Sequence, residues 1–259
     1  RPISLAALTV LDVSPANQVL CAAKAGYSHV GIRLYPATPT ETQWDMIGDT
    51  PMVREVEANL KATGVKVLDI EILRIKPDTR AINWKPFFET GARLGATQVL
   101  CAGNDPDLNR LTDNFAELCE IAHPFGLNLS IEPMPWCNVS TVKQMNTILR
   151  KINRPNAGCL VDPIHFYRAD NDYKDIDALP EGALKYCQMC DITAEKPDTM
   201  DGILYQARNF RLSPGTGAAD LPRLLKHLPN LPISIEACNA ALALTMSPLD
   251  RARLYLEDM

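Results

Sequence analysis

Apolar residues follow two alternating patterns along the chain. Eight short runs are rich in aliphatic and β-branched residues, and they lie at 3–10, 29–34, 65–73, 97–103, 127–133, 157–163, 184–192 and 232–237. Between these runs, apolar residues recur every three or four positions, which is typical of amphipathic helices. The pattern therefore predicts strands and helices that alternate from one end of the chain to the other.

The stretches between the strands carry helix start and stop signals. In 14–26, Ser14 is the expected N-cap, Pro15 suits the first turn and Gly26 suits the stop. The stretches 50–64 and 105–126 carry similar signals. Several of these stretches end in a glycine shortly before the next strand, because glycine adopts a left-handed conformation without steric cost.

Eight strand–helix units in 259 residues, without a break in composition, predict an α/β protein with a single (β/α)8 TIM barrel domain over 1–259. An open doubly wound sheet is the alternative. That fold places a glycine-rich phosphate loop after the first strand, and "LTVLDVSPANQ" contains no glycine. The barrel is favoured, so active-site residues are expected where strands end.

Composition and charge argue against several classes of protein. No apolar run reaches the roughly 18–20 residues that cross a bilayer, and the first residues do not resemble a signal peptide. The net charge of −5 and the pI near 5.4 argue against nucleic acid as a partner. The eight cysteines lie mostly in apolar segments, so we expect reduced thiols and a cytoplasmic protein.

One pair of cysteines has the spacing of a zinc or redox motif, Cys187-x-x-Cys190. Side chains of a strand alternate between its two faces. If Gln188 points into the barrel, Cys187 faces the helices and Cys190 the inner side. The two thiols then cannot share a zinc ion or a disulfide, and we interpret the motif as packing.

Four consecutive strands carry an oxygen ligand at or near their ends, namely Glu132, Asp162, Gln188 and Glu236. Carboxylates that converge at one barrel mouth repel each other unless a cation lies between them. An all-oxygen set suits a hard or borderline divalent ion such as Mg²⁺ or Mn²⁺. The alternative is structural, with each acid capping a helix or pairing with an arginine of a loop.

The chain resembles the xylose isomerase-like superfamily over essentially its whole length. The motifs that carry the resemblance are "IEPMP" with Glu132, "VDPIH" with Asp162 and His165, "CQMCD" with Gln188, "RLSPGTGAAD" with Arg211, and "ISIEA" with Glu236. The superfamily includes sugar isomerases and epimerases, hydroxypyruvate isomerase, dehydroshikimate and inosose dehydratases, and an endonuclease of apurinic-site repair.

The resemblance implies a metal site and substrate contacts. Asp162 would bind the metal, and His165 and Arg211 would contact the substrate. The ligand on the seventh strand is histidine in many members, and glutamine in the hydroxypyruvate isomerase-like and dehydroshikimate dehydratase-like ones, as Gln188 is here. We expect one divalent ion, Mg²⁺, Mn²⁺ or Co²⁺, with Zn²⁺ as a further option.

The residues of this chain do not suit the function of the repair nuclease, because that enzyme assembles three zinc ions and needs many histidines. This chain has four histidines, His29, His123, His165 and His227. Asn209–Arg211 stands where the nuclease has a zinc-binding Asp-x-His. One metal ion can be held here, but three cannot.

Arginines near the strand ends bear on the substrate. Arg33 ends the second predicted strand, Arg74 follows the third, and Arg211 precedes "SPGTG". At a barrel mouth, an arginine pairs with an acid or binds an anion. We expect Arg33, Glu71, His165 and Arg211 to contact a small anionic substrate. Glu71 is left open between pairing with an arginine and binding substrate hydroxyls. We expect neither nucleic acid nor a membrane as partner, and leave a homo-oligomer open.

Three further segments are interpreted from position alone. The long connection 33–51 is interpreted as a lid over the site, and Trp136 as an apolar wall. The "PGTG" segment, 214–217, is first a turn signal, with anion binding as the alternative.

The leading hypothesis is a divalent-metal-dependent isomerase or epimerase of a small hydroxy-keto sugar or sugar acid, acting through an enediolate. Glu132 and Glu236 would remove and return the proton, while Asp162 and Gln188 complete the metal shell. One alternative is a metal-dependent dehydratase of the dehydroshikimate or inosose type with the same site. Another is a non-catalytic protein that binds sugar acids.

Overall fold

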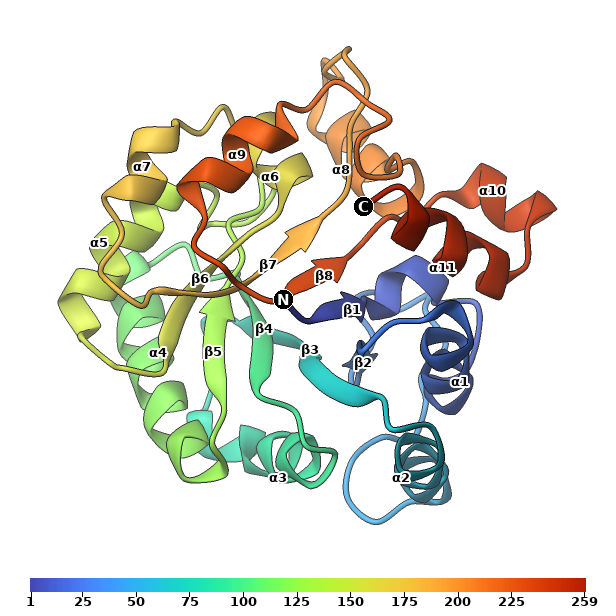
Figure 1. The fold of residues 1–259 in the computed structure, drawn as a ribbon. Helices are drawn as coiled ribbons and strands as arrows, with labels where there is room; N and C mark the ends of the chain where they lie inside the picture. Colours follow the sequence, from blue (N-terminus) through green and yellow to red (C-terminus); the bar gives the residue numbers. More distant parts are fainter.

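Eight parallel strands close into a barrel in the computed structural model, which describes all 259 residues (Figure 1). The strands are β1 (Ile3–Leu5), β2 (His29–Arg33), β3 (Lys66–Ile75), β4 (Gln98–Gly103), β5 (Asn128–Ile131), β6 (Ala157–Val161), β7 (Leu184–Met189) and β8 (Ile233–Ile235). β1 pairs with β2 on one side and with β8 on the other, so no strand edge is left free. The predicted (β/α)8 barrel is confirmed.

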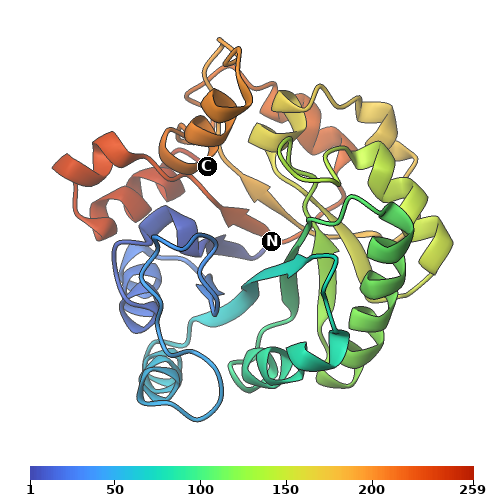
Figure 2. The ribbon, with the colours of Figure 1, turned by 180° about the vertical axis from the view of Figure 1, so that it is seen from behind.

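Helices surround the strands on the outside, as the two opposite views show (Figures 1 and 2). They are α1 (Pro15–Ala25), α2 (Pro51–Thr63), α3 (Lys85–Arg93), α4 (Leu108–Ala122), α5 (Val142–Ile152), α6 (Pro163–Arg168), α7 (Tyr173–Asp177), α8 (Met200–Asn209), α9 (Leu221–His227), α10 (Ala240–Thr245) and α11 (Pro248–Glu257). Three short 3₁₀ helices lie at Ala7–Val10, Ala81–Trp84 and His123–Phe125.

The predicted helix signals act as expected. The Ser14 hydroxyl accepts a hydrogen bond from the Asn17 N–H at the start of α1. Gly26 and Gly64 end α1 and α2 with φ angles of 100° and 75°. The predicted helix over 105–126 is divided, because Pro124 cannot donate the next helical hydrogen bond and the chain continues as a 3₁₀ turn.

The first strand is shorter than predicted. The apolar run 3–10 forms only the three residues of β1, and Ala7–Val10 turn into a 3₁₀ helix. The Thr9 hydroxyl donates to the Ile235 carbonyl at 2.8 Å and fixes this turn across the end of β8. A short apolar run that is buried in either conformation does not distinguish strand from helix by its periodicity.

The barrel interior changes character along its axis. Part of the interior is apolar or aromatic, including Leu68, Leu100, Leu160 and Tyr186, which form a cluster separate from the large core beneath the helices. A buried polar layer contains Ser4, Ser234 and Gln188 in register, and Glu132 and Glu236 follow at the carboxyl ends of their strands. Because the interior of an eight-stranded barrel is filled by side chains, the chemistry is confined to this end.

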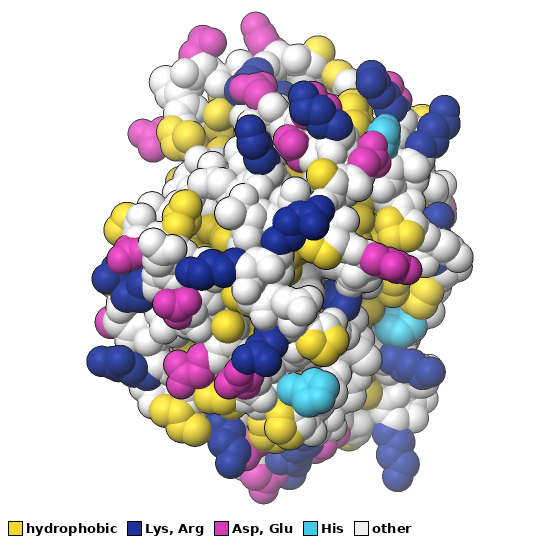
Figure 3. All heavy atoms as spheres, turned by 90° about the vertical axis from the view of Figure 1, so that its left-hand side faces the viewer, with side chains coloured by type: hydrophobic (Ala, Val, Ile, Leu, Met, Phe, Trp, Pro, Cys, Tyr) yellow, Lys and Arg dark blue, Asp and Glu magenta, His cyan; other side chains and the backbone are white.

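The outer face over α4, α5 and α7 carries acidic and basic side chains side by side, without a large patch of one sign (Figure 3). None of the helices combines the length and the apolar character that crossing a membrane requires.

Candidate active site

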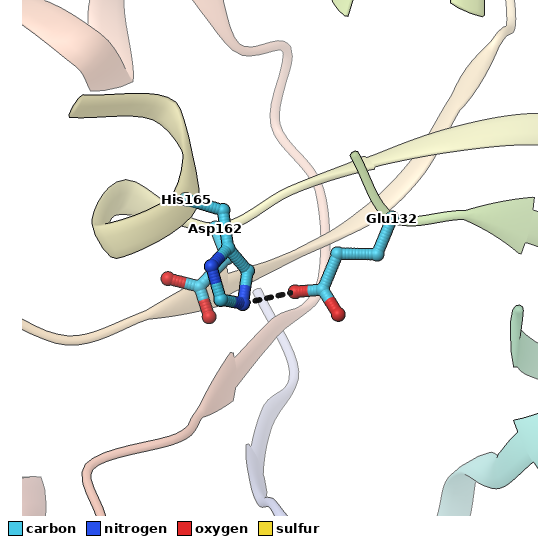
Figure 4. A group of neighbouring side chains, drawn as sticks. All are labelled: Glu132, Asp162 and His165. Carbon is cyan, nitrogen blue, oxygen red and sulfur yellow. Dashed lines mark ion pairs between the residues drawn. The ribbon is translucent and has the colours of Figure 1, made fainter. Parts of the chain in front are cut away.

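Three potential metal ligands converge at the carboxyl ends of β5 and β6. Glu132 follows β5, Asp162 follows β6, and His165 lies in the first turn of α6. All three are buried, and one ligand atom from each lies within 4.8 Å of the others. Their side chains point toward one another (Figure 4). The chain order explains this geometry, since Asp162 is the N-cap of α6 and its Oδ1 accepts from the Ile164 N–H at 2.9 Å.

Glu132 is the least compensated carboxylate of the site. Its Oε1 lies 3.4 Å from the Nε2 of His165 and accepts no hydrogen bond. Burial, with the nearby charges of Glu236 and Asp162, raises the pKa of Glu132 well above its usual range. Burial also lowers the pKa of His165 to about 3, so its imidazole is neutral. The pair therefore offers a carboxylate that readily takes up a proton beside a neutral ring.

Arg211 holds two of the predicted ligands together. Its Nη1 lies 2.6 Å from Asp162 Oδ2, and its Nη2 lies 2.8 Å from Glu236 Oε2. Burial alone would raise the pKa of Asp162, but Arg211 keeps it below the usual value. Burial raises the pKa of Glu236 to about 7, with Arg211 opposing the rise. Arg211 is itself 2% exposed and also donates to the Ala207 carbonyl, so its charge is used inside the protein and offsets part of the charge of the two carboxylates.

Gln188 links the seventh strand to the same cluster. Its Nε2 donates to Glu236 Oε1 at 2.9 Å, while its Oε1 has no partner. The Oε1 of Glu132 and the Nδ1 of His165 are likewise buried without a hydrogen bond. Each unpartnered buried polar atom costs roughly 1–3 kcal/mol unless a ligand or water satisfies it. Carboxylate, amide and imidazole donors with free lone pairs fit a borderline divalent ion.

Structural partners exist for two of the three predicted carboxylate ligands. Asp162 both caps α6 and pairs with Arg211, and Glu236 pairs with Arg211 and Gln188. Glu132 neither caps a helix nor pairs with an arginine. The structural alternative therefore leaves Glu132 unexplained.

A second ionic cluster lies on the other side of the mouth. The guanidinium of Arg33 contacts Glu41 Oε2 at 2.9 Å and Glu71 Oε2 at 3.2 Å. Glu71 was expected either to pair with an arginine or to bind substrate hydroxyls. In the structure its Oε2 pairs with Arg33, and its Oε1 has no partner. Glu41 belongs to the long connection after β2, and its Oε2 also accepts from the Ala37 N–H.

Most of these groups line one cavity of about 60 Å³, whereas the predicted ligands Asp162 and Gln188 lie behind its lining. Its lining includes the expected site residues Arg33, Glu71, Glu132, His165, Arg211 and Glu236. Trp136 also lines it, with its ring edge-on to the imidazole of His165 at 5.0 Å between centroids. The cavity has room for a few water molecules, so a ring-sized substrate requires a side chain of the lining to move.

Comparison with known protein families agrees with this geometry. The family model of the xylose isomerase-like TIM barrel matches residues 20–258. The chain belongs to this family. The matched residues include every strand of the barrel except β1.

Individual relatives in the xylose isomerase-like family are enzymes. A 3-dehydroshikimate dehydratase of Pseudomonas aeruginosa is 29% identical over 188 residues, which are 66% of this chain and 29% of the relative. An inosose isomerase of Bacillus subtilis is 29% identical over 124 residues, 47% of this chain and 42% of the relative. Each match thus spans less than half the length of the curated relative.

A solved structure described as the IolI protein with a bound zinc atom has the same fold. It aligns with a TM-score of 0.79 at 19% identity, covering 100% of this chain and 97% of that one. At this identity the likeness is one of fold.

The paired cysteines of this xylose isomerase-like barrel do not form a joint site. Both are buried free thiols, and β7 ends between them at Met189. The Cys187 thiol lies 3.8 Å from the Pro232 carbonyl, whereas the Cys190 thiol donates to Asp162 Oδ1 at 3.4 Å. The interpretation of the motif as packing agrees with these separate contacts.

The carboxylate of Asp191 accepts a hydrogen bond from the "PGTG" segment. The two oxygens of Asp191 accept from the backbone N–H groups of Ile192, Gly215 and Ala219 at 2.8–3.1 Å. A Cβ at Gly217 would lie 2.5 Å from Asp191 Oδ1, so only glycine fits there. The segment is a turn around Asp191, and these donors are not free for an anion.

Two polar residues of the cavity were not foreseen from the sequence. Glu41 lies in a connection without regular structure, and Arg208 lies on α8. Neither follows a strand, which is the signal that identified Glu132, Asp162 and Glu236, and neither belongs to a motif of the resemblance. Two of the remaining histidines lie far from this chemistry, since His29 begins β2 and His227 pairs with Asp177 at the end of α9.

Proposed function

We propose that this xylose isomerase-like protein is a metal-dependent enzyme that moves a proton on the carbon beside a carbonyl group. Its substrate would be a small hydroxy-keto sugar or sugar acid, and its reaction an isomerisation or epimerisation. The observation that carries the proposal is Glu132, a buried carboxylate at the cavity with a raised pKa and an oxygen without a hydrogen-bond partner. A general base needs this combination.

The donors around Glu132 would hold the metal ion. Glu132, Asp162, Gln188 and Glu236 supply oxygens, and the neutral imidazole of His165 faces the same space. Such a mixed set favours Mn²⁺, Co²⁺ or Zn²⁺ over Mg²⁺, and the zinc described in the IolI neighbour supports this preference. When bound, the ion would polarise the substrate's carbonyl and hydroxyl oxygens.

The protein's own groups would handle the proton. Glu132 would accept it from one face of the substrate, and Glu236 would return it from the other. Gln188 and Arg211 fix the Glu236 carboxylate by direct hydrogen bonds. His165 would orient a substrate oxygen, and Trp136 against its ring would limit the access of water.

A dehydratase is the second candidate, because a 3-dehydroshikimate dehydratase matches 66% of this chain and an inosose isomerase only 47%. Proton removal by Glu132 would be the same. The neighbouring carbon would then lose its hydroxyl group, and the proton and hydroxide would leave together as water. Only the identity of the product separates the two reactions.

Proton NMR in D₂O tests both candidates. Metal-loaded and EDTA-treated protein are incubated with inosose, hydroxypyruvate and 3-dehydroshikimate, and loss of the α-proton signal is followed. We expect metal-dependent exchange that falls at least about 100-fold in Glu132→Gln. Glu117→Gln, which removes an exposed carboxylate of α4, serves as the control.

The new signals identify the product as an isomer or a dehydrated compound. Undiminished exchange in Glu132→Gln would show that this carboxylate is not the base. Exchange that persists after complete metal removal would contradict the proposed role of the ion.

A further inference from the structure

Two arginines of the cavity have no acidic partner. Arg74, near the end of β3, donates to the Asn104 side-chain oxygen at 3.1 Å and to the Ala37 carbonyl at 3.2 Å, which are both neutral acceptors. Arg208, near the end of α8, is half-buried, and its side chain makes neither a hydrogen bond nor an ion pair within the protein. Both arginines line the cavity.

The remaining arginines of the cavity are in the opposite situation. Arg33 and Arg211 are each bonded to two carboxylates. The protein already binds every guanidinium nitrogen of Arg211 and both Nη atoms of Arg33, and only the buried Nε of Arg33 lacks a partner. An anion that enters the cavity therefore finds most of its free donors on Arg74 and Arg208.

The two free arginines line the same cavity. Burial lowers the pKa of Arg74, and the charge of Arg208 adds to this effect. Two like charges in a partly desolvated place are unfavourable unless an anion lies between them. Guanidinium groups bind carboxylate and phosphate oxygens with paired, directional hydrogen bonds, so such an anion would be well held.

The charge of the whole site favours an anion of charge −1. The site contains four arginines, Arg33, Arg74, Arg208 and Arg211, and five carboxylates, Glu41, Glu71, Glu132, Asp162 and Glu236. With a divalent ion bound and every carboxylate ionised, one positive charge remains. A single carboxylate balances that charge, whereas a phosphate dianion exceeds it.

We propose that Arg74 and Arg208 together bind the carboxylate of the substrate, which is therefore a small hydroxy-keto acid rather than a neutral sugar. The inference rests on the proposed function, because it names the substrate class of the same site. It places the acid group beside β3 and α8, and the reacting carbon beside Glu132.

The test measures binding, so that it does not depend on turnover. Isothermal titration of the metal-loaded protein compares hydroxy acids, shikimate and glycerate, with their neutral carboxamides, which have nearly the same shape. We expect at least one acid to bind about tenfold more tightly than its amide. Arg74→Met and Arg208→Met should each lower this preference about tenfold, while the lysine variants keep part of it.

Arg80→Met is the matched control, because Arg80 is exposed near Arg74 and does not line the cavity. It should leave the preference unchanged. Equal binding of acid and amide by the native protein, or an unaltered preference in both arginine variants, would overturn the inference. So would inorganic phosphate that binds more tightly than either acid and loses its affinity in Arg74→Met.

The deuterium-exchange experiment separates this inference from the proposed function. A charge preference that depends on Arg74 and Arg208, without proton exchange on any substrate, would support the acid-binding site and refute the enzymatic proposal. Glu132-dependent proton exchange without a preference for acids over amides would support the enzymatic proposal and refute the acid-binding site.

Discussion

Arg211 offers a direct test of how the site is held together. Arg211→Met removes the guanidinium while keeping a side chain of similar length in the same space. Asp162 and Glu236 then remain buried, 1% and 3% exposed, without the cation that contacts both at 2.6 and 2.8 Å. Removing one partner of a buried ion pair costs roughly 3–5 kcal/mol. At roughly 2–4 °C per kcal/mol, the midpoint of thermal unfolding should fall by about 10 °C.

The loss of stability in Arg211→Met should depend on pH. In the native protein, Arg211 keeps the pKa of Asp162 below its usual value, although burial alone would raise it. A depressed carboxyl pKa contributes stability above the unfolded value near 4, and this stability is lost as the pH falls through the folded pKa. Without Arg211 the contribution is absent, so the native protein and the variant should differ more at pH 8 than at pH 4.

Urea denaturation in EDTA at both pH values measures the difference, with Arg80→Met as the control for a lost surface charge. Addition of Mn²⁺ should restore part of the lost stability in the variant, because the ion compensates the same carboxylates. A variant within about 1 kcal/mol of the native protein at pH 8, where the reasoning requires a loss of at least 3 kcal/mol, would refute it.

Three further predictions concern groups outside the proposed chemistry. Burial raises the pKa of Asp69 well above its usual range, so the stability of the native protein should fall as pH rises above about 4. Asp69→Asn should show a smaller fall, because only the contributions of Glu132 and Glu236 remain, and should be the more stable protein at pH 8 by urea denaturation; parallel pH curves would contradict this. Gly217→Ala should lose about 1–3 kcal/mol in the same assay, since its Cβ would lie against the Ile192 carbonyl. Mild oxidation of the native protein should give no Cys187–Cys190 disulfide by mass spectrometry, because the two thiols have separate surroundings.

The fold followed from local signals because tertiary structure does not override them here. The helix that begins after Ser14 and ends at Gly26 is defined by side-chain capping and by a left-handed turn, and both are properties of single residues. The 3₁₀ helix after Leu5 could not be foreseen in this way. It depends on a hydrogen bond from Thr9 to the Ile235 carbonyl, a partner 226 residues away in the sequence.

The site also contains some residues that local sequence signals identify and others that depend on tertiary structure. Glu132, Asp162 and Glu236 were recognisable because a polar residue directly after a buried parallel strand lies at the barrel mouth. Which arginine pairs with which acid was not recognisable, because Arg33 meets Glu41 through a connection whose path the sequence pattern does not give. Arg208 lies on a helix, where only the packing of that helix decides which residue faces the cavity.

The pairing of Arg211 also bears on how a metal ion would enter. Asp162 and Glu236 already share their charge with the guanidinium, whereas an oxygen of Glu132 and an oxygen of Gln188 are uncommitted. An incoming ion would therefore gain most from these two oxygens, since satisfying them removes an existing cost. Because Arg211 pairs with both of the other carboxylates, it offsets part of their mutual repulsion within the protein itself. The polar residues at the ends of four neighbouring strands thus form one electrostatic unit. Arg211 is the cation that the chain itself supplies, and the donors that it does not bind are left for a metal ion.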